Sequence, residues 1–81
     1  MEETKNTVKN YILEQFLPGE NPDELTDSTS LITGGILDSL AALQLVEFLE
    51  EKYGILIEAH EVDVDNLNTI ASIANFVHSK L

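Results

Sequence analysis

Apolar residues recur at helical spacing in three separate segments, and this periodicity constrains the fold more than any other feature. The segments are residues 3–17, 39–53 and a final stretch from about residue 69 to the end of the chain. The stripes consist of Val8, Ile12 and Phe16, then Ala42, Leu45, Val46, Leu49 and Tyr53, and lastly Ile70, Ile73, Ala74, Val77 and Leu81. Each stripe is typical of an amphipathic helix that packs one face against a shared core. Asn68 or Thr69 is the expected cap of the last helix.

The segment between the last two stripes is harder to assign. Ile55-Leu56-Ile57 resembles a short strand, but no second strand is available to pair with it. We expect instead a loop and one short helix at about residues 59–64, with Val62 and Leu67 facing the core. The sequence thus predicts an all-α fold, a small four-helix bundle with three main helices and one short one, in a single domain over residues 1–81.

A stretch of about twenty residues, 18–37, joins the first two main helices. Pro18-Gly19 ends the first helix, and turn-forming residues dominate the rest of the stretch. Loops of this length are uncommon in compact domains unless they have a function. This one also carries five apolar residues that can attach it to the bundle, namely Leu25, Leu31, Ile32, Ile36 and Leu37. We therefore predict an ordered crossover.

Asp38-Ser39 opens the second main helix, with Asp38 as its N-cap and Gly54 as its C-cap. Backbone N–H groups at a helix start lack intrahelical partners and lie at the positive end of the helix dipole, which suits a phosphate. No histidine or basic residue is close to Ser39 in sequence. The pattern favours Ser39 as an attachment point over a nucleophile.

Charge is concentrated around this serine. Four lysines, no arginine and fifteen acidic residues give a net charge of −11. The whole excess lies in residues 20–65, where twelve acidic residues face Lys52 alone. Such a field repels nucleic acid and anionic membranes and attracts basic partners. An acidic surface that only maintains solubility is an equally good interpretation of the charge taken alone.

The second helix carries two leucines, Leu40 and Leu43, on the face opposite its apolar stripe. One interpretation is that they pack under the long loop. The other is a partner contact, in which a small apolar anchor is rimmed by polar and acidic residues. The face predicted to bind partners consists of Leu40, Leu43, Gln44, Glu47, Glu50 and Glu51.

Catalytic and specific metal chemistry find little support in the sequence. Only His60 and His78 could act as a base near neutral pH, and nothing pairs either of them with Ser39. The run of residues 63–66 hints at a calcium loop, but the required glycine is missing and Ala74 occupies the last ligand position. We expect no enzymatic activity and no specific metal site. Any divalent binding would be loose, at Glu58, Glu61, Asp63 and Asp65.

The chain has no cysteine, no signal-like N-terminus and no apolar run long enough to span a membrane. We therefore expect a cytoplasmic monomer that neither enters a membrane nor binds nucleic acid.

Two runs of residues resemble the acyl carrier and peptidyl carrier proteins. They are Gly35-Ile36-Leu37-Asp38-Ser39-Leu40 and Phe48-Leu49-Glu50-Glu51-Lys52-Tyr53-Gly54-Ile55. The resemblance extends over nearly the whole chain, because the order of helices, the long loop, the length and the acidity also match. Asp-Ser-Leu alone is a weak motif, and the combination is strong.

The resemblance implies that Ser39 carries 4′-phosphopantetheine, installed from coenzyme A by a phosphopantetheinyl transferase, with Asp38 supporting that step. The arm would hold an acyl, aminoacyl or aryl group as a thioester. A loading ligase or acyltransferase would supply the group, and a downstream synthase or transferase would receive it. The competing hypothesis is an unmodified acidic helical adaptor that binds basic proteins through Leu40, Leu43 and the surrounding acids.

The chain also departs from the pattern of fatty-acid carriers. Those proteins usually have acidic residues where this chain has Ala41 and Gln44, and an exposed apolar residue where it has Glu47. The Ile36-Leu37 pair is more similar to stand-alone carriers of aminoacyl, aryl or specialised acyl groups, including the D-alanine carriers. These departures favour a dedicated pathway over general fatty-acid synthesis.

Overall fold

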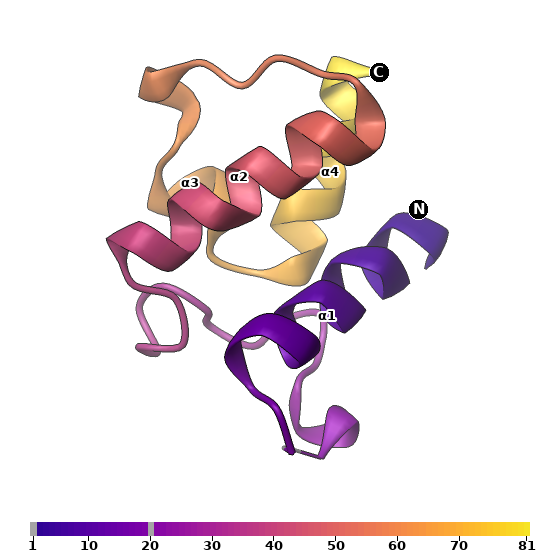
Figure 1. Cartoon of the computed structure of the whole chain (residues 1–81), viewed down its shortest axis with the longest axis vertical. Helices are drawn as coiled ribbons and strands as arrows, with labels where there is room; N and C mark the ends of the chain where they lie inside the picture. Colours follow the sequence, from indigo (N-terminus) through magenta and orange to yellow (C-terminus); the bar gives the residue numbers. More distant parts are fainter. Residues whose placement is uncertain (1, 20) are drawn as a thin grey trace.

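The computed structural model describes residues 2–19 and 21–81, and its regular elements are helices joined by loops (Figure 1). Its elements are α1 (Glu2–Phe16), the 3-10 turn η1 (Pro22–Glu24), α2 (Ser39–Tyr53), the 3-10 turn η2 (Ala59–Glu61), α3 (Val64–Leu67) and α4 (Ile70–Lys80). No strand occurs in the described ranges. The predicted all-α bundle of three main helices and one short one is confirmed.

The apolar stripes meet in one core. Val8 and Ile12 of α1 are fully buried, as are Leu45 and Leu49 of α2, and α1 packs directly against α4. The stripe predicted for the last helix needs one correction. Leu81 is 68% exposed, because α4 ends at Lys80, whereas Phe76, which the stripe did not include, is buried beside the predicted Val77. Phe76 also lies near the charged end of Lys80, which stands 5.6 Å from its ring centre.

The segment after α2 also differs from the prediction. A single helix at residues 59–64 is wrong, because the chain forms η2, breaks, and starts again as α3. The break has a local cause. Asp63 adopts an extended conformation and its carboxylate accepts a hydrogen bond from Asn66 N–H at 2.9 Å, so it caps a new helix. Leu67 is fully buried and Val62 half-buried, as the apolar pattern predicted.

The long crossover is ordered by the side chains predicted to hold it. Leu25, Leu31 and Leu37 are buried in the core, and Ile32 and Ile36 pack against its edge. Backbone hydrogen bonds add to this attachment, because Asp27 C=O accepts the N–H of Ala71 at the start of α4.

An aromatic contact joins the end of α1 to α2. The Tyr11 ring stacks on Phe48 with 4.0 Å between centroids, and its hydroxyl donates to the Gln44 carbonyl at 3.2 Å. Burial, and secondarily the charge of Glu47, raise the pKa of Tyr11 above its ordinary value. Tyr11 therefore stays a neutral donor at physiological pH.

An ion pair between Lys80 and Glu61 fastens the end of α4 to η2. The hydrogen bond from Lys80 lowers the pKa of Glu61, and a second hydrogen bond from Glu58 N–H acts in the same direction. A carboxyl group whose pKa is lower in the folded state stabilises the fold above its unfolded pKa, and this contribution is lost as pH falls through the folded pKa.

We predict that Lys80→Gln lowers the thermal midpoint at neutral pH and weakens its decline on acidification, because Glu61 then titrates closer to its unfolded value. Thermal melts of wild type and variant between neutral and acidic pH measure the effect. Lys9→Gln, which removes the same charge from α1, is the control. A constant offset between Lys80→Gln and wild type at every pH would contradict the prediction.

Candidate functional site

Asp38 fixes the start of α2. Its backbone is extended, and its carboxylate accepts a hydrogen bond from Ala41 N–H at 2.8 Å. At the other end, Gly54 has a positive φ of 66° and its N–H bonds to the carbonyl of Glu50. Both predicted caps are confirmed. Ser39 is consequently the first helical residue, and its side chain is exposed.

A tight turn over residues 31–37 delivers the chain to this helix start. The carbonyl of Leu31 accepts the N–H groups of both Ile36 and Leu37 at 2.9 Å. The turn needs glycine at two consecutive positions. A Cβ on Gly34 would lie 2.2 Å from the Ser30 carbonyl oxygen, and Gly35 has a φ of +83°. The backbone conformation before Ser39 is therefore determined by these hydrogen bonds and by the two glycines.

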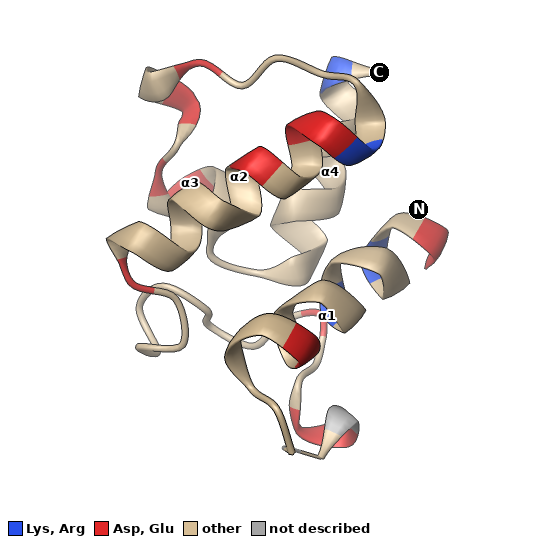
Figure 2. Cartoon of the chain, viewed as in Figure 1, with Lys and Arg blue, Asp and Glu red and all other residues tan. Residues whose placement is uncertain are grey.

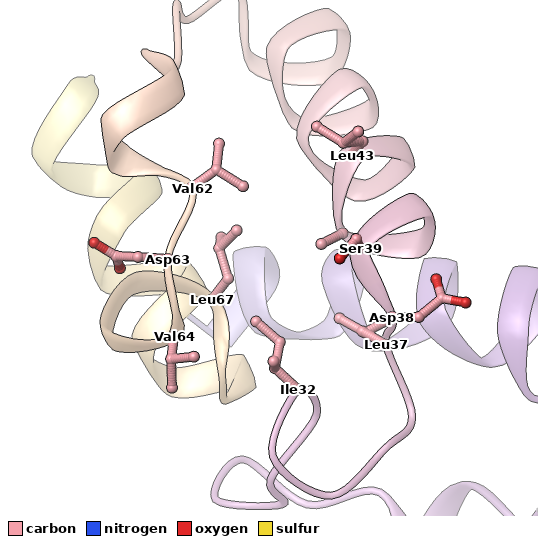
Figure 3. Close-up of a pocket in the computed structure, with 10 residues that line it drawn as sticks. Ile32, Leu37, Asp38, Ser39, Leu43, Val62, Asp63, Val64 and Leu67 are labelled. Carbon is pink, nitrogen blue, oxygen red and sulfur yellow. The ribbon is translucent and has the colours of Figure 1, made fainter.

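A groove of about 560 Å³ opens beside Ser39, between α2 and the segment from Val62 to Leu67. It is lined by Ile32, Leu37, Asp38, Ser39, Ala42, Leu43, Val62, Asp63, Val64 and Leu67. Figure 3 shows the apolar side chains of Leu43, Val62 and Leu67 on its inner walls, whereas the carboxylates of Asp38 and Asp63 point away from it. The space beside Ser39 is consequently apolar inside and acidic at its margin.

Leu40 and Leu43 of α2 lie outside the core, with Leu43 at the wall of the groove. Leu40 is 64% and Leu43 53% exposed, so the interpretation that they pack under the long loop is wrong. Gln44, Glu47 and Glu51 are exposed along the same helix. Figure 2 shows acidic residues on α2 and again on the segment containing η2 and α3, across the groove.

Glu50 differs from the other acidic residues of this face. It is half-buried, and its Oε2 accepts a hydrogen bond from Ile57 N–H at 2.9 Å. Its carboxylate thus orders the backbone that leaves α2. That engagement makes Glu50 less available to a partner than Glu47 or Glu51.

Two of the four carboxylates considered for loose divalent binding already have a partner in the fold. Glu61 pairs with Lys80, Asp63 caps α3, and Glu58 and Asp65 are exposed. Within residues 2–19 and 21–81, no group of three or more His, Cys, Asp or Glu side chains is arranged to hold a metal ion. Loose binding at these four residues remains a prediction.

The two histidines lie in different settings. His60 is exposed on η2, and the Nε2 of His78 on α4 is 2.8 Å from the Thr4 hydroxyl on α1. His78 thus joins the first and last helices.

None of the helices in the described ranges is long and apolar enough to cross a lipid bilayer.

Sequence reasoning missed one residue that shapes this site. Asn68, between α3 and α4, binds the turn over residues 31–37 through its side chain and its backbone carbonyl. The sequence pattern indicates Asn68 only as a candidate cap of the last helix, a position that Thr69 occupies, with its hydroxyl accepting Ser72 N–H. No local signal in the sequence links Asn68 to a turn so far away.

The site thus consists of an exposed serine at a capped helix start, beside an apolar groove with acidic margins. The family model described as "Phosphopantetheine attachment site" matches residues 12–77, and the chain belongs to that family. The group that this family attaches covalently is 4′-phosphopantetheine.

Individual relatives are carrier proteins. The chain is 37% identical over 68 residues to the probable acyl carrier protein PigG of Serratia sp.. The aligned residues make up 84% of this chain and 77% of PigG. The chain is 28% identical over 81 residues to the D-alanyl carrier protein of Streptococcus suis, covering 95% and 99% of the two chains. Transferases and synthases or ligases are the general partners of such carriers.

One similar chain among the solved structures belongs to a structure described as "Crystal structure of FAD-dependent dehydrogenase". It superimposes on this protein with a TM-score of 0.77. The identity is 30%, over 86% of this chain and 97% of the other.

Proposed function

We propose that Ser39 is the residue that carries the phosphopantetheine arm, and that the protein delivers a thioester-bound group to the enzymes of a dedicated biosynthetic pathway. The observation that carries the proposal is the exposed position of Ser39 as first residue of α2, directly behind the capping Asp38. The bound arm supplies a terminal thiol, which holds the carried group.

The other serines fit an attached group less well. Ser28 and Ser30 are exposed in the crossover, outside any helix start. On α4, the Oγ of Ser72 accepts a hydrogen bond from the Thr69 hydroxyl, and the hydroxyl of Ser79 donates to a backbone carbonyl. Ser39 alone among the described serines combines exposure with the first position of a long helix.

The helix start is suited to an esterified phosphate. Ser39 lies where backbone N–H groups have no intrahelical acceptor, and a negative charge at such a position gains about 0.3–1 kcal/mol when it is exposed. Asp38 stabilises this end of α2 by accepting a hydrogen bond from Ala41 N–H. By family resemblance, Asp38 also supports the modification step. The chain's own contribution is therefore to orient Ser39 and to be recognised, without catalysing a reaction.

The carried group is of acyl, aminoacyl or aryl type. Names of the relatives include both acyl and D-alanyl carriers, and Ala41 and Gln44 replace acidic residues that fatty-acid carriers usually have. The partners we propose are a loading ligase or acyltransferase and a downstream synthase or transferase, in the cytoplasm.

Partner enzymes would approach the outer face of α2. Leu40 and Leu43 offer an apolar contact, and the exposed acids Glu47 and Glu51 surround it. Gln44 extends this surface, with Glu50 at its inner edge.

We predict that charge reversal at Glu47 or Glu51 slows association with a phosphopantetheinyl transferase more than reversal at Glu2 or Glu3, because only the first pair lies on α2, the helix that begins at Ser39. Association with wild type should also slow as salt rises, since exposed charges are screened beyond about 10 Å at 0.1 M salt. Stopped-flow or surface-binding kinetics at several salt concentrations measure both effects. Equal losses at the two ends of the molecule would mean that only bulk charge matters.

The test of the function is the intact mass of the apo protein before and after incubation with coenzyme A and a broad-specificity phosphopantetheinyl transferase. We expect a gain of one phosphopantetheine group and a new free thiol that accepts an acyl group. The competing function, an unmodified acidic adaptor that binds basic proteins, predicts no change in mass. An unchanged mass would therefore replace the carrier proposal with the adaptor.

A further inference from the structure

Asn68 is hydrogen-bonded to a single distant turn through both its backbone and its side chain. Its backbone carbonyl accepts Leu31 N–H at 2.6 Å. Its side-chain Oδ1 accepts Ile32 N–H at 2.9 Å and Thr33 N–H at 3.0 Å. Asn68 itself lies between the end of α3 and the N-cap of α4, so it links the turn to two helices at once.

Both ends of the Asn68 side-chain amide have partners in the turn. Two successive backbone N–H groups converge on Oδ1, and the Nδ2 group is 3.3 Å from the Thr33 hydroxyl oxygen. A backbone donor that loses its partner away from water costs free energy, so replacing this oxygen by hydrocarbon disfavours the observed turn.

The turn held by Asn68 leads directly to Ser39. Leu31, bonded to Asn68 through its N–H, uses its own carbonyl to close the turn onto Leu37, and Asp38 follows as the cap of α2. Two successive hydrogen bonds thus connect the α3–α4 junction to Leu37, two residues before Ser39.

The same contact sets one wall of the groove. Ile32, whose N–H bonds to Asn68, lines the groove together with Val62 and Leu67 from the opposite segment (Figure 3). If the turn moved, Ile32 would leave this wall and the approach to Ser39 would change.

We propose that Asn68 is a positioning residue for the modification of Ser39. Acting through the turn over residues 31–37, it presents the serine and the groove wall in one fixed arrangement. The inference rests on the proposed function of Ser39. Asn68 does not itself contact the serine or the transferred group.

A graded series at position 68 tests the role. Asn68→Asp retains the acceptor oxygen, Asn68→Ser offers a shorter acceptor, and Asn68→Ala removes it. The control is Asn66→Ala, which removes a side-chain hydrogen bond of similar length, 2.9 Å from Nδ2 to the Glu61 carbonyl, without touching the turn.

The measurements are kcat/KM of a phosphopantetheinyl transferase for each apo variant and amide hydrogen exchange at residues 31–33. We expect kcat/KM to fall about fivefold or more for Asn68→Ala, less for Asn68→Ser, and less than about twofold for Asn68→Asp, because a typical net hydrogen bond corresponds to such a factor. Exchange at Ile32 and Thr33 should accelerate in the same order and stay unchanged in Asn66→Ala.

Two outcomes would contradict the role of Asn68. Equal slowing in Asn68→Ala and Asn66→Ala, in proportion to lost stability, would reduce Asn68 to a structural role and overturn the inference. Modification of Asn68→Ala at the wild-type rate would overturn it as well. If the alanine variant does not fold by circular dichroism, the serine and aspartate variants decide by the same criteria. Failure of wild type to be modified would instead contradict the proposed function.

Discussion

Ser39→Ala is expected to take up no phosphopantetheine at all, while its helical circular dichroism stays that of wild type. The hydroxyl oxygen forms the phosphodiester, so its removal leaves nothing to modify. The fold should be unaffected, because the Ser39 side chain is exposed and the cap of α2 is provided by Asp38. Intact mass after incubation with coenzyme A and a transferase measures the loss.

Ser30→Ala is the matched control for this variant, since Ser30 is an exposed serine in the crossover leading to α2. It should be modified as fully as wild type. Residual modification of Ser39→Ala would mean that another side chain accepts the group.

Ile73→Ala is expected to lower the free energy of unfolding by about 2–5 kcal/mol, the range for truncating a buried isoleucine to alanine. Ile73 is fully buried on α4 within the shared core. A domain of this size buries only about 60% of the surface of its unfolded chain, so such a loss is a large part of its stability. Low salt should aggravate it, because the net charge of −11 opposes compaction.

Urea unfolding followed by circular dichroism measures this change. Asn75→Ala is the control, because Asn75 is exposed on the same helix and its truncation leaves no cavity. Similar losses in the two variants would show that α4 does not pack as described.

Local signals in the sequence were sufficient for the main helices and for the start of α2. The Asp38 and Gly54 caps act within a few residues of the helix they terminate, so their effect can be predicted from neighbouring residues. Periodicity likewise predicted that Leu45 and Leu49 would be buried, whereas it left the surroundings of Leu40 open between the long loop and a partner contact.

The errors lie where a local pattern had competing outcomes. Residues 59–64 could continue as one helix, but Asp63 caps a new one through Asn66 N–H and divides the segment in two. Leu81 fits the stripe of α4, yet the helix ends before it, and Phe76 is buried although the stripe did not include it. Helix ends and the choice between neighbouring apolar residues depend on packing that a sequence pattern does not contain.

The contacts that shape the surroundings of Ser39 join distant parts of the chain. Asn68 and Ile32 are separated by 36 positions, and nothing in either neighbourhood indicates that they pair. Glu50 belongs to the acidic face by periodicity, but its long side chain reaches Ile57 N–H and serves the fold. A helical period predicts which face a residue occupies and gives no information about its hydrogen-bond partner.

The most direct test is to locate the attached group by fragment-ion mass spectrometry of peptides from the modified wild-type protein. We expect every modified peptide to carry a single phosphopantetheine on Ser39, with Ser28 and Ser30 unmodified. A group located on either of these loop serines, or no modified peptide at all, would contradict the assignment of Ser39 as the attachment residue.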